Sequence, residues 1–130
     1  MITLDASVVI AHLRPKDLHH EAATAYLRAH ADEELLIHPL NLAEVLVGGV
    51  RVGRGDELQA DLNALGIQAV VPREGEPLRL ATLQVETGLK LPDCCALNTA
   101  VTSGSALATF DDKLAEAARA RHVPVGGRPV

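Results

Sequence analysis

Residues 2–13 read ITLDASVVIAHL, in which a short apolar run ends at Asp5 and a helical pattern follows at once. We expect a buried strand over residues 2–4 and a helix over residues 6–13 that stops near Pro15. Asp5 would then lie where the strand gives way to the helix. In a parallel sheet all such junctions share one edge, and α/β proteins bind their ligands along that edge.

Strand-like and helix-like patterns alternate along the rest of the chain. The further predicted strands cover residues 35–38, 67–71, 106–110 and 123–125. The further predicted helices cover residues 22–30, 41–50, 58–65, 78–89, 92–102 and 112–121. This alternation predicts an α/β three-layer sandwich, with a mainly parallel sheet of about five strands and helices on both faces. The length suits a single domain, residues 1–130.

Composition narrows the class of protein further. Hydrophobic residues make up 48% of the chain and aromatic residues only 2%, so the core must consist of Leu, Val, Ile and Ala, and no aromatic platform for nucleobases is expected. The net charge of −5 excludes a general basic field that would attract nucleic acid. No apolar segment can span a membrane and no signal peptide precedes the first strand, so we expect a cytoplasmic protein. The adjacent Cys94 and Cys95 are expected to be reduced core residues.

Three more acids occupy positions comparable to that of Asp5. Glu44 follows the second predicted strand, Asp93 opens a helix after Pro92, and Asp111 ends the strand at 106–110. Several carboxylates in one small site repel one another, and a divalent cation held by oxygens relieves that repulsion. Each acid alone is better explained as a helix cap or as a charge that complements a helix dipole. The stretch Asn41–Glu44 even has the spacing of a capping box. A metal site and structural capping therefore both stay open.

Four stretches resemble the PIN-domain family: LDASVVIAHL at 4–13, NLAEVLVG at 41–48, LPDCCALNTA at 91–100 and ATFDDKL at 108–114. They occur in the family's order over essentially the whole chain, and the likeness is greatest to VapC-type toxins of type II toxin–antitoxin systems. The resemblance implies a PIN-like fold and an endoribonuclease, a hydrolase that depends on Mg²⁺ or Mn²⁺. It also implies three partners: an RNA substrate, a cognate antitoxin and a second copy of the chain in a homodimer.

The resemblance assigns roles to individual residues. It implies that the catalytic and metal-binding acids are Asp5, Glu44, Asp93 and Asp111. Ser7 and Thr109 match small hydroxyl residues that would hold carboxylates or phosphate by hydrogen bonds. The division of labour between Asp111 and Asp112 stays open, and we favour a solvated first-turn acid for Asp112. Basic residues near these motifs are candidates for contacts with the RNA backbone: Arg14, Lys16, Arg51, Lys90 and Lys113.

Helix 41–50 carries more apolar residues than a single core-facing side of a helix requires. Its second apolar side is therefore a candidate surface for a partner. We expect a basic antitoxin segment to bind along this helix, where Gly48 and Gly49 would allow close approach. Packing on two sides within the same domain is the alternative. The extra apolar positions are Leu42, Val45, Leu46, Val47 and Val50.

Other α/β classes fit less well. A receiver-like regulatory domain needs an acidic pair after the first strand and an Asp after the third, where Val70-Val71-Pro72 stands. A haloacid-dehalogenase-like phosphatase needs two Asp separated by one residue, and Asp5-Ala6-Ser7 lacks the second. The six histidines form no H-E-x-x-H motif, and we predict no metal role for them. A PIN-like module that only binds a partner remains an alternative.

Overall fold

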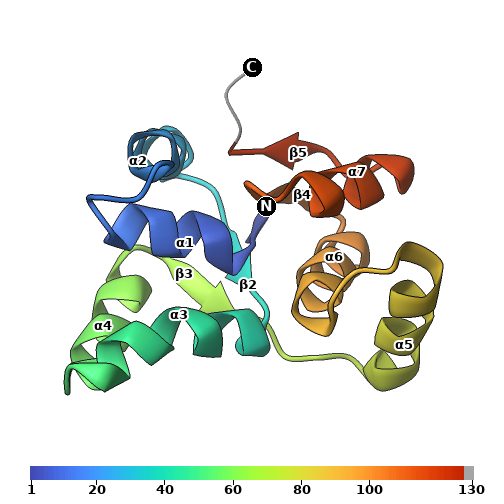
Figure 1. The fold of residues 1–130 in the computed structure, drawn as a ribbon, viewed down its shortest axis with the longest axis horizontal. Coiled ribbons are helices and arrows are strands. Elements are labelled where there is room, and N and C mark those ends of the chain that lie inside the picture. Colours follow the sequence, from blue (N-terminus) through green and yellow to red (C-terminus); the bar gives the residue numbers. More distant parts are fainter. Residues whose placement is uncertain (128–130) are drawn as a thin grey trace.

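The structure is a computed structural model that describes residues 1–127, so the last three residues of the predicted 1–130 domain lie outside the described residues. The described residues form five strands and seven helices (Figure 1). The strands are β1 (Ile2–Leu4), β2 (Leu35–Ile37), β3 (Ile67–Ala69), β4 (Ala106–Ala108) and β5 (Val125–Gly126). The helices are α1 (Ala6–Leu13), α2 (His20–Ala29), α3 (Pro39–Arg51), α4 (Gly55–Ala64), α5 (Glu76–Thr87), α6 (Leu91–Ser103) and α7 (Asp112–Ala120).

The strands form one parallel sheet in the order β3-β2-β1-β4-β5. β1 lies at its centre, with Ile2 paired to Leu35 of β2 on one side and to Ala106 of β4 on the other. The predicted five-stranded parallel sheet is therefore confirmed. Because every strand runs the same way, the chain leaves each strand at the same edge.

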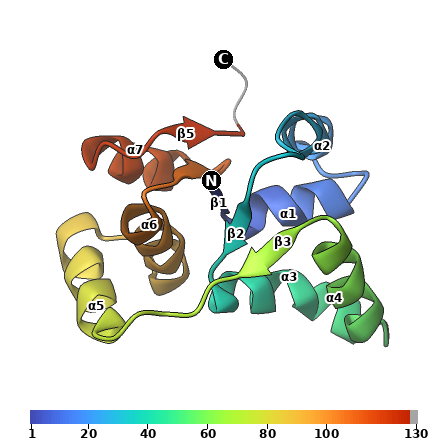
Figure 2. The same cartoon turned by 180° about the vertical axis from the view of Figure 1, so that it is seen from behind.

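The helices cover both faces of the sheet, and Figures 1 and 2 show α1 to α4 on one side and α5 to α7 on the other. Each face has its own core, because successive residues of a strand point to opposite sides. Ile2 and Leu4 belong to the core under the N-terminal helices, whereas Leu107 packs with Leu97 and Leu114 under the C-terminal helices. The predicted three-layer sandwich is confirmed.

Two element boundaries differ from the sequence prediction. α3 begins at Pro39, and His38 caps it by accepting a hydrogen bond from the Leu40 N–H at Nδ1. The predicted capping box at Asn41–Glu44 is therefore wrong, because Asn41 already lies inside the helix. The last strand covers Val125–Gly126 rather than residues 123–125, because Leu107 and Thr109 of the neighbouring strand segment donate to Pro124 and Gly126 carbonyls.

The two cysteines are free thiols buried in α6, 0% and 2% exposed, which confirms their predicted place in the core. Burial raises the pKa of Cys95 to about 11, and the charges of Glu76 and Glu44 add to the effect. Both thiols therefore stay protonated at neutral pH. Within residues 1–127, no helix has both the length and the apolar composition needed to cross a membrane.

Adjacent glycines in α3 have different surroundings. A Cβ added to Gly49 would lie 2.9 Å from Leu58 Cδ2 and 3.4 Å from the Arg54 carbonyl oxygen, so Gly49 allows α4 to pack closely on α3. A Cβ on Gly48 would meet only the Arg14 guanidinium, at 3.9 Å. The predicted close approach at Gly49 is therefore made by the chain's own α4, while Gly48 remains open.

This difference predicts opposite effects of the same substitution. Gly48→Ala should raise the free energy of unfolding by about 0.5–1 kcal/mol, because alanine restricts the unfolded chain and favours the helix. Gly49→Ala should lower the melting temperature instead, since overpacking against Leu58 costs about 1–3 kcal/mol. Thermal unfolding of the two variants tests this, and equal stabilisation by both would contradict the packing of α4 on Gly49.

Candidate active site

Asp5 lies at the carboxyl end of the central strand and is only 6% exposed. The Ser7 and Thr109 hydroxyls both donate to its Oδ2, at 2.8 and 2.9 Å, which orients the carboxylate. Burial raises the pKa of Asp5, while these two hydrogen bonds and one from the Ala6 backbone oppose the rise by stabilising the charged form. The side chain makes no capping hydrogen bond to α1. Asp5 is therefore held toward the edge of the sheet rather than used as a helix cap.

Asp111 enters the same region from the neighbouring strand. Its N–H donates to Thr109 Oγ1 at 3.0 Å, and Thr109 in turn donates to Asp5, so one threonine connects the two acids. The Asp111 Oδ1 accepts the Leu114 N–H at 2.9 Å and caps α7. Asp111 therefore has a structural role as well as a position beside Asp5. Asp112 is the first residue of α7 and is exposed.

Asp93 shows most directly that the four acids converge. It is the third residue of α6 and is partly exposed. Burial, the largest cause, and the charges of Asp5, Asp111 and Glu44 together raise its pKa to about 6, against the opposing charge of Lys90. Side chains that come from both faces of the sheet thus act on one carboxyl group, as expected for a shared edge.

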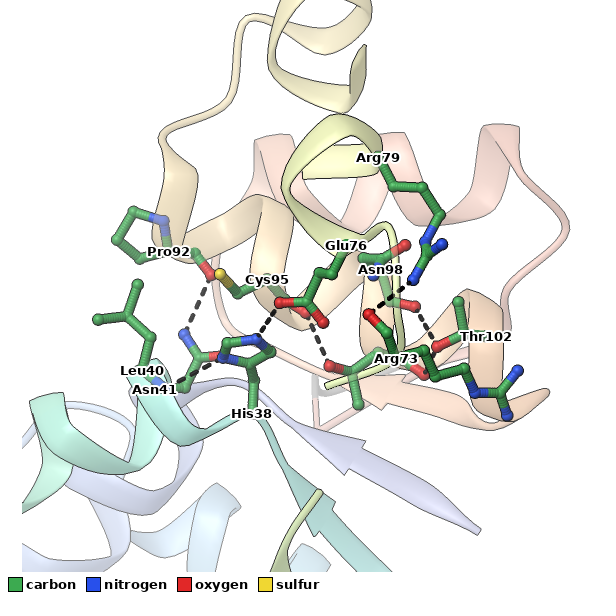
Figure 3. Close-up of polar contacts among 11 residues, drawn as sticks. His38, Leu40, Asn41, Arg73, Glu76, Arg79, Pro92, Cys95, Asn98 and Thr102 are labelled. Carbon is green, nitrogen blue, oxygen red and sulfur yellow. Dashed lines mark hydrogen bonds and ion pairs between the residues drawn. The ribbon is translucent and has the colours of Figure 1, made fainter. Parts of the chain in front are cut away.

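Glu44 reaches the site from α3 and is positioned by Asn41, a residue that the sequence analysis treated only as a cap. The Asn41 side chain is fully buried, and its Nδ2 donates to Glu44 Oε1 at 3.1 Å and to the Pro92 carbonyl at 3.0 Å. Because Pro92 immediately precedes Asp93, Asn41 connects α3 to the start of α6 (Figure 3). The available signal in the sequence was an Asn placed three residues before an acid, one turn away on the same predicted helix.

The four carboxylates suit a hard divalent cation in chemistry but are not yet closed around a common point. Among residues 1–127, no three Asp, Glu, His or Cys side chains lie close enough together to hold a metal ion as they stand. Four carboxylates are nevertheless the oxygen donors that Mg²⁺ and Mn²⁺ prefer. The raised pKa of Asp93 reflects like charges that a cation would offset. The residues present therefore fit such an ion.

The candidate RNA-binding residues lie in different places. Lys90 is the N-cap residue of α6 and its charge lowers the pKa of Asp93, so it lies close to the acids. Arg14 follows α1 and lines the groove described below together with Glu44. Lys16, Arg51 and Lys113 are exposed, and their contact with RNA stays a prediction.

A groove of about 400 Å³ runs between α1, α3 and α4, and Glu44 lies in its lining. Charged side chains such as Arg14 and Asp61 line it, together with apolar side chains such as Leu13 and Val52. Val47 is 46% exposed and does not line the groove; at 100° per residue it lies about 60° around α3 from Glu44 and about 160° from Val45. Glu44 therefore belongs both to the acids and to the lining of the groove.

The raised pKa of Asp93 predicts a pH-dependent cost in the metal-free protein. A folded pKa of about 6 exceeds the unfolded value of about 3.9, so Asp93 stabilises the fold most below about pH 4 and loses that contribution as pH rises through 6. Because the group is partly solvated, we expect a loss on the order of 1 kcal/mol.

The asparagine in Asp93→Asn does not titrate, so this variant avoids the loss. The melting temperature of the variant minus that of the native protein should therefore increase by roughly 3–5 °C between pH 4.0 and pH 7.5. Thermal unfolding with a chelator present measures this difference. Glu116→Gln, at an exposed position of α7, is the matched control and should show little change with pH. A difference for Asp93→Asn that does not grow between the two pH values would contradict convergence of the acids.

Comparison with solved structures finds chains of the same fold. A toxin–antitoxin complex from Klebsiella pneumoniae is 22% identical, covers 85% of this chain and 87% of its own, and has a TM-score of 0.73. FitAcB from Neisseria gonorrhoeae is 22% identical over 96% of both chains, with a TM-score of 0.70. PAE2754 from Pyrobaculum aerophilum is 21% identical over 95% of this chain and 89% of its own, with a TM-score of 0.60.

Sequence comparison assigns the family. No match was found among curated proteins. The family model for the PIN domain, however, matches residues 2–120, which contain all four acids and every strand of the sheet except β5. The resemblance of the four short motifs is thus confirmed at the level of the family. The chain belongs to the PIN domain family.

Proposed function

We propose that this protein is a metal-dependent endoribonuclease and the toxin of a toxin–antitoxin pair. The observation that carries the proposal is the convergence of four carboxylates on one edge of the sheet, expressed in the raised pKa of Asp93. Membership of the PIN domain family and the resemblance to VapC-type toxins support the nuclease activity. The solved structures of similar fold include a toxin–antitoxin complex, which supports the toxin role.

In this proposal the chain's own residues prepare the site. Asp5, Asp93, Glu44 and Asp111 would hold the cation, with Ser7 and Thr109 fixing the Asp5 carboxylate and Asn41 fixing Glu44. A bound Mg²⁺ or Mn²⁺ supplies a water of lowered pKa and neutralises charge on the scissile phosphate. Attack by water in line with the leaving oxygen gives a 5′-phosphate and a 3′-hydroxyl.

RNA would be held by local features, because the net charge of −5 provides no general attraction. Lys90 lies beside Asp93, where it can pair with a backbone phosphate. The His19 ring stacks on Phe110, next to Asp111, with centroids 4.3 Å apart. An imidazole can stack on a base as Tyr, Phe and Trp do, so the His19–Phe110 pair is a candidate contact for a base.

Substitution of the acids tests the activity. Asp5→Asn and Asp93→Asn should each lower the rate of RNA cleavage in Mg²⁺ or Mn²⁺ by more than about 100-fold, because an amide is a much weaker ligand for these ions. Asp112→Asn is the matched control and should keep cleavage within about threefold, since the neighbouring Asp111 caps α7 and is the acid connected to Thr109. Cleavage of a labelled RNA pool followed by analysis of the product ends measures both the rate and the chemistry.

The same assay can refute the proposal. If Asp5→Asn cleaves RNA at the rate of the native protein, the assigned site is wrong. If the native protein cleaves no RNA in either ion, the chain is a PIN-like module that only binds a partner. Loss of activity in Asp112→Asn but not in an Asp111→Asn variant would move the fourth acid to Asp112.

The antitoxin is proposed to occupy the groove between α1, α3 and α4. Its lining carries three acids, Glu44, Glu57 and Asp61, against two arginines, Arg14 and Arg54, so the acids can pair with an arginine of the antitoxin segment. Occupation beside Glu44 would exclude RNA from the acids. The homodimer, the cytoplasmic location and the extent of the domain to residue 130 remain proposals that rest on the resemblance and on the sequence.

Two valines of α3 test this placement. Val52 lines the groove and is 72% exposed, whereas Val47 is 46% exposed and lies outside the lining of the groove. Val52→Lys should weaken the complex with the cognate antitoxin at least tenfold, because it replaces apolar contact with a charge of the partner's own sign. Val47→Lys should change the affinity less than threefold. Isothermal titration calorimetry compares them, and the reverse order would place the antitoxin outside the groove.

A further inference from the structure

A buried pair of ionisable side chains joins the start of α3 to the start of α5 (Figure 3). His38 Nε2 and Glu76 Oε1 lie 2.7 Å apart, and the two residues are 6% and 9% exposed. They come from positions 38 residues apart, one at the end of β2 and the other in the first turn of α5. Neither belongs to the four acids, and the mechanism above does not use them.

The imidazole uses both of its nitrogens. Nδ1 accepts the Leu40 N–H at 3.0 Å and so caps α3, which leaves Nε2 to carry the proton and donate to Glu76. Doubly protonated histidine would place a proton on Nδ1 facing the Leu40 N–H. One neutral tautomer therefore satisfies both contacts at once, and it fixes the direction in which α3 leaves the sheet.

The first turn of α3 also carries the residue that joins the two faces of the site. Asn41 lies three residues after His38, and its amide holds both Glu44 and the carbonyl that precedes Asp93. A shift or rotation of this turn would move Asn41 and, through it, the spacing between Glu44 and Asp93. The His38–Glu76 contact opposes such a shift because it anchors the turn to α5.

Stability alone does not explain a buried imidazole–carboxylate pair at this position. Replacing such a pair with well-packed apolar residues is often neutral or stabilising, because both groups lose hydration on burial. A hydrogen bond, unlike apolar packing, fixes direction and distance. We propose that the His38–Glu76 pair is a positioning element that sets the first turn of α3, so that Asn41 keeps Glu44 in register with Asp93.

The catalytic consequence of this inference rests on the nuclease function proposed above. His38 and Glu76 are positioning residues, since they act on Glu44 through Asn41. Their loss should lower kcat and the affinity for the metal, while KM for RNA changes little because the RNA contacts lie elsewhere.

Substitutions can separate the two contacts of His38. Asparagine carries its oxygen near the place of Nδ1 and is a good N-cap, but it cannot reach Glu76. Glutamine reaches the place of Nε2 and can donate to Glu76, but it is a poor cap. The double variant His38→Asn/Glu76→Met keeps the cap, removes the pair and leaves neither partner buried without the other.

The double variant should melt within about 3 °C of the native protein, because an apolar side chain replaces the buried carboxylate. Its kcat should fall about 10- to 100-fold, with KM within about twofold. His38→Gln should restore most of the lost kcat. Native kcat in the double variant would overturn the proposal, as would a loss of kcat in His38→Gln equal to that in the double variant.

Binding of Mn²⁺ alone, followed by the electron paramagnetic resonance of the free ion, gives a readout that needs no RNA cleavage. The double variant should bind Mn²⁺ about tenfold more weakly than the native protein and than His38→Gln. Equal Mn²⁺ affinities in all three would overturn the positioning role. If the native protein binds Mn²⁺ but cleaves no RNA, the nuclease proposal fails, while the ranking of Mn²⁺ affinities still decides the role of the pair.

Should the double variant fail to fold, His38→Asn/Glu76→Gln carries the same test, because asparagine keeps the cap and glutamine leaves no buried carboxylate without its partner. Hydrogen exchange at the Leu40 amide then reports on the first turn without metal or RNA. Native-like protection of Leu40 together with reduced Mn²⁺ affinity supports positioning through the pair. Native-like protection with native affinity overturns it.

Discussion

Parallel pairing of β1 with both β2 and β4 is the constraint on which the site depends. It places Asp5 beside Thr109, although the two lie 104 positions apart, and Thr109 then connects Asp5 with Asp111. The same pairing makes the chain leave each strand at one edge, which brings α3 and α6 to the acids from opposite faces. Repulsion among the carboxylates is thus opposed by the sheet and its two apolar cores.

The acids differ in how firmly they are held. Burial is the first cause of the raised pKa of both Asp5 and Asp93. Hydrogen bonds from two hydroxyls favour the charged form of Asp5, however, whereas Asp93 faces three like charges. The half of the site built on β1 and β4 is therefore preorganised, and the half built on α3 and α6 can adjust. Asn41 and the His38–Glu76 pair restrict that adjustment.

The periodicity of the sequence was sufficient to predict the layers, the parallel sheet and the edge on which the acids lie. The start of α3 was missed although Pro39 is a strong signal for the first helical position, because Asn41 and Glu44 offered a competing capping pattern. The contact between His38 and Glu76 could not be predicted, since no local pattern relates a strand end to the first turn of a distant helix. Gly49 reads as a weak point in a helix until α4 is seen packed against it.

The central place of β1 also determines when the site can form during synthesis. Domains gain structure from the N-terminus as the chain emerges, and non-local parallel pairings form slowly. β1, α1 and β2 can associate early, but Asp5 lacks its Thr109 partner and its Asp111 neighbour until β4 has been made. A nascent chain that ends before β4 therefore contains at most three of the four acids and no complete carboxylate site. The four acids therefore come together only after the central pairing of β1 with β4 has formed.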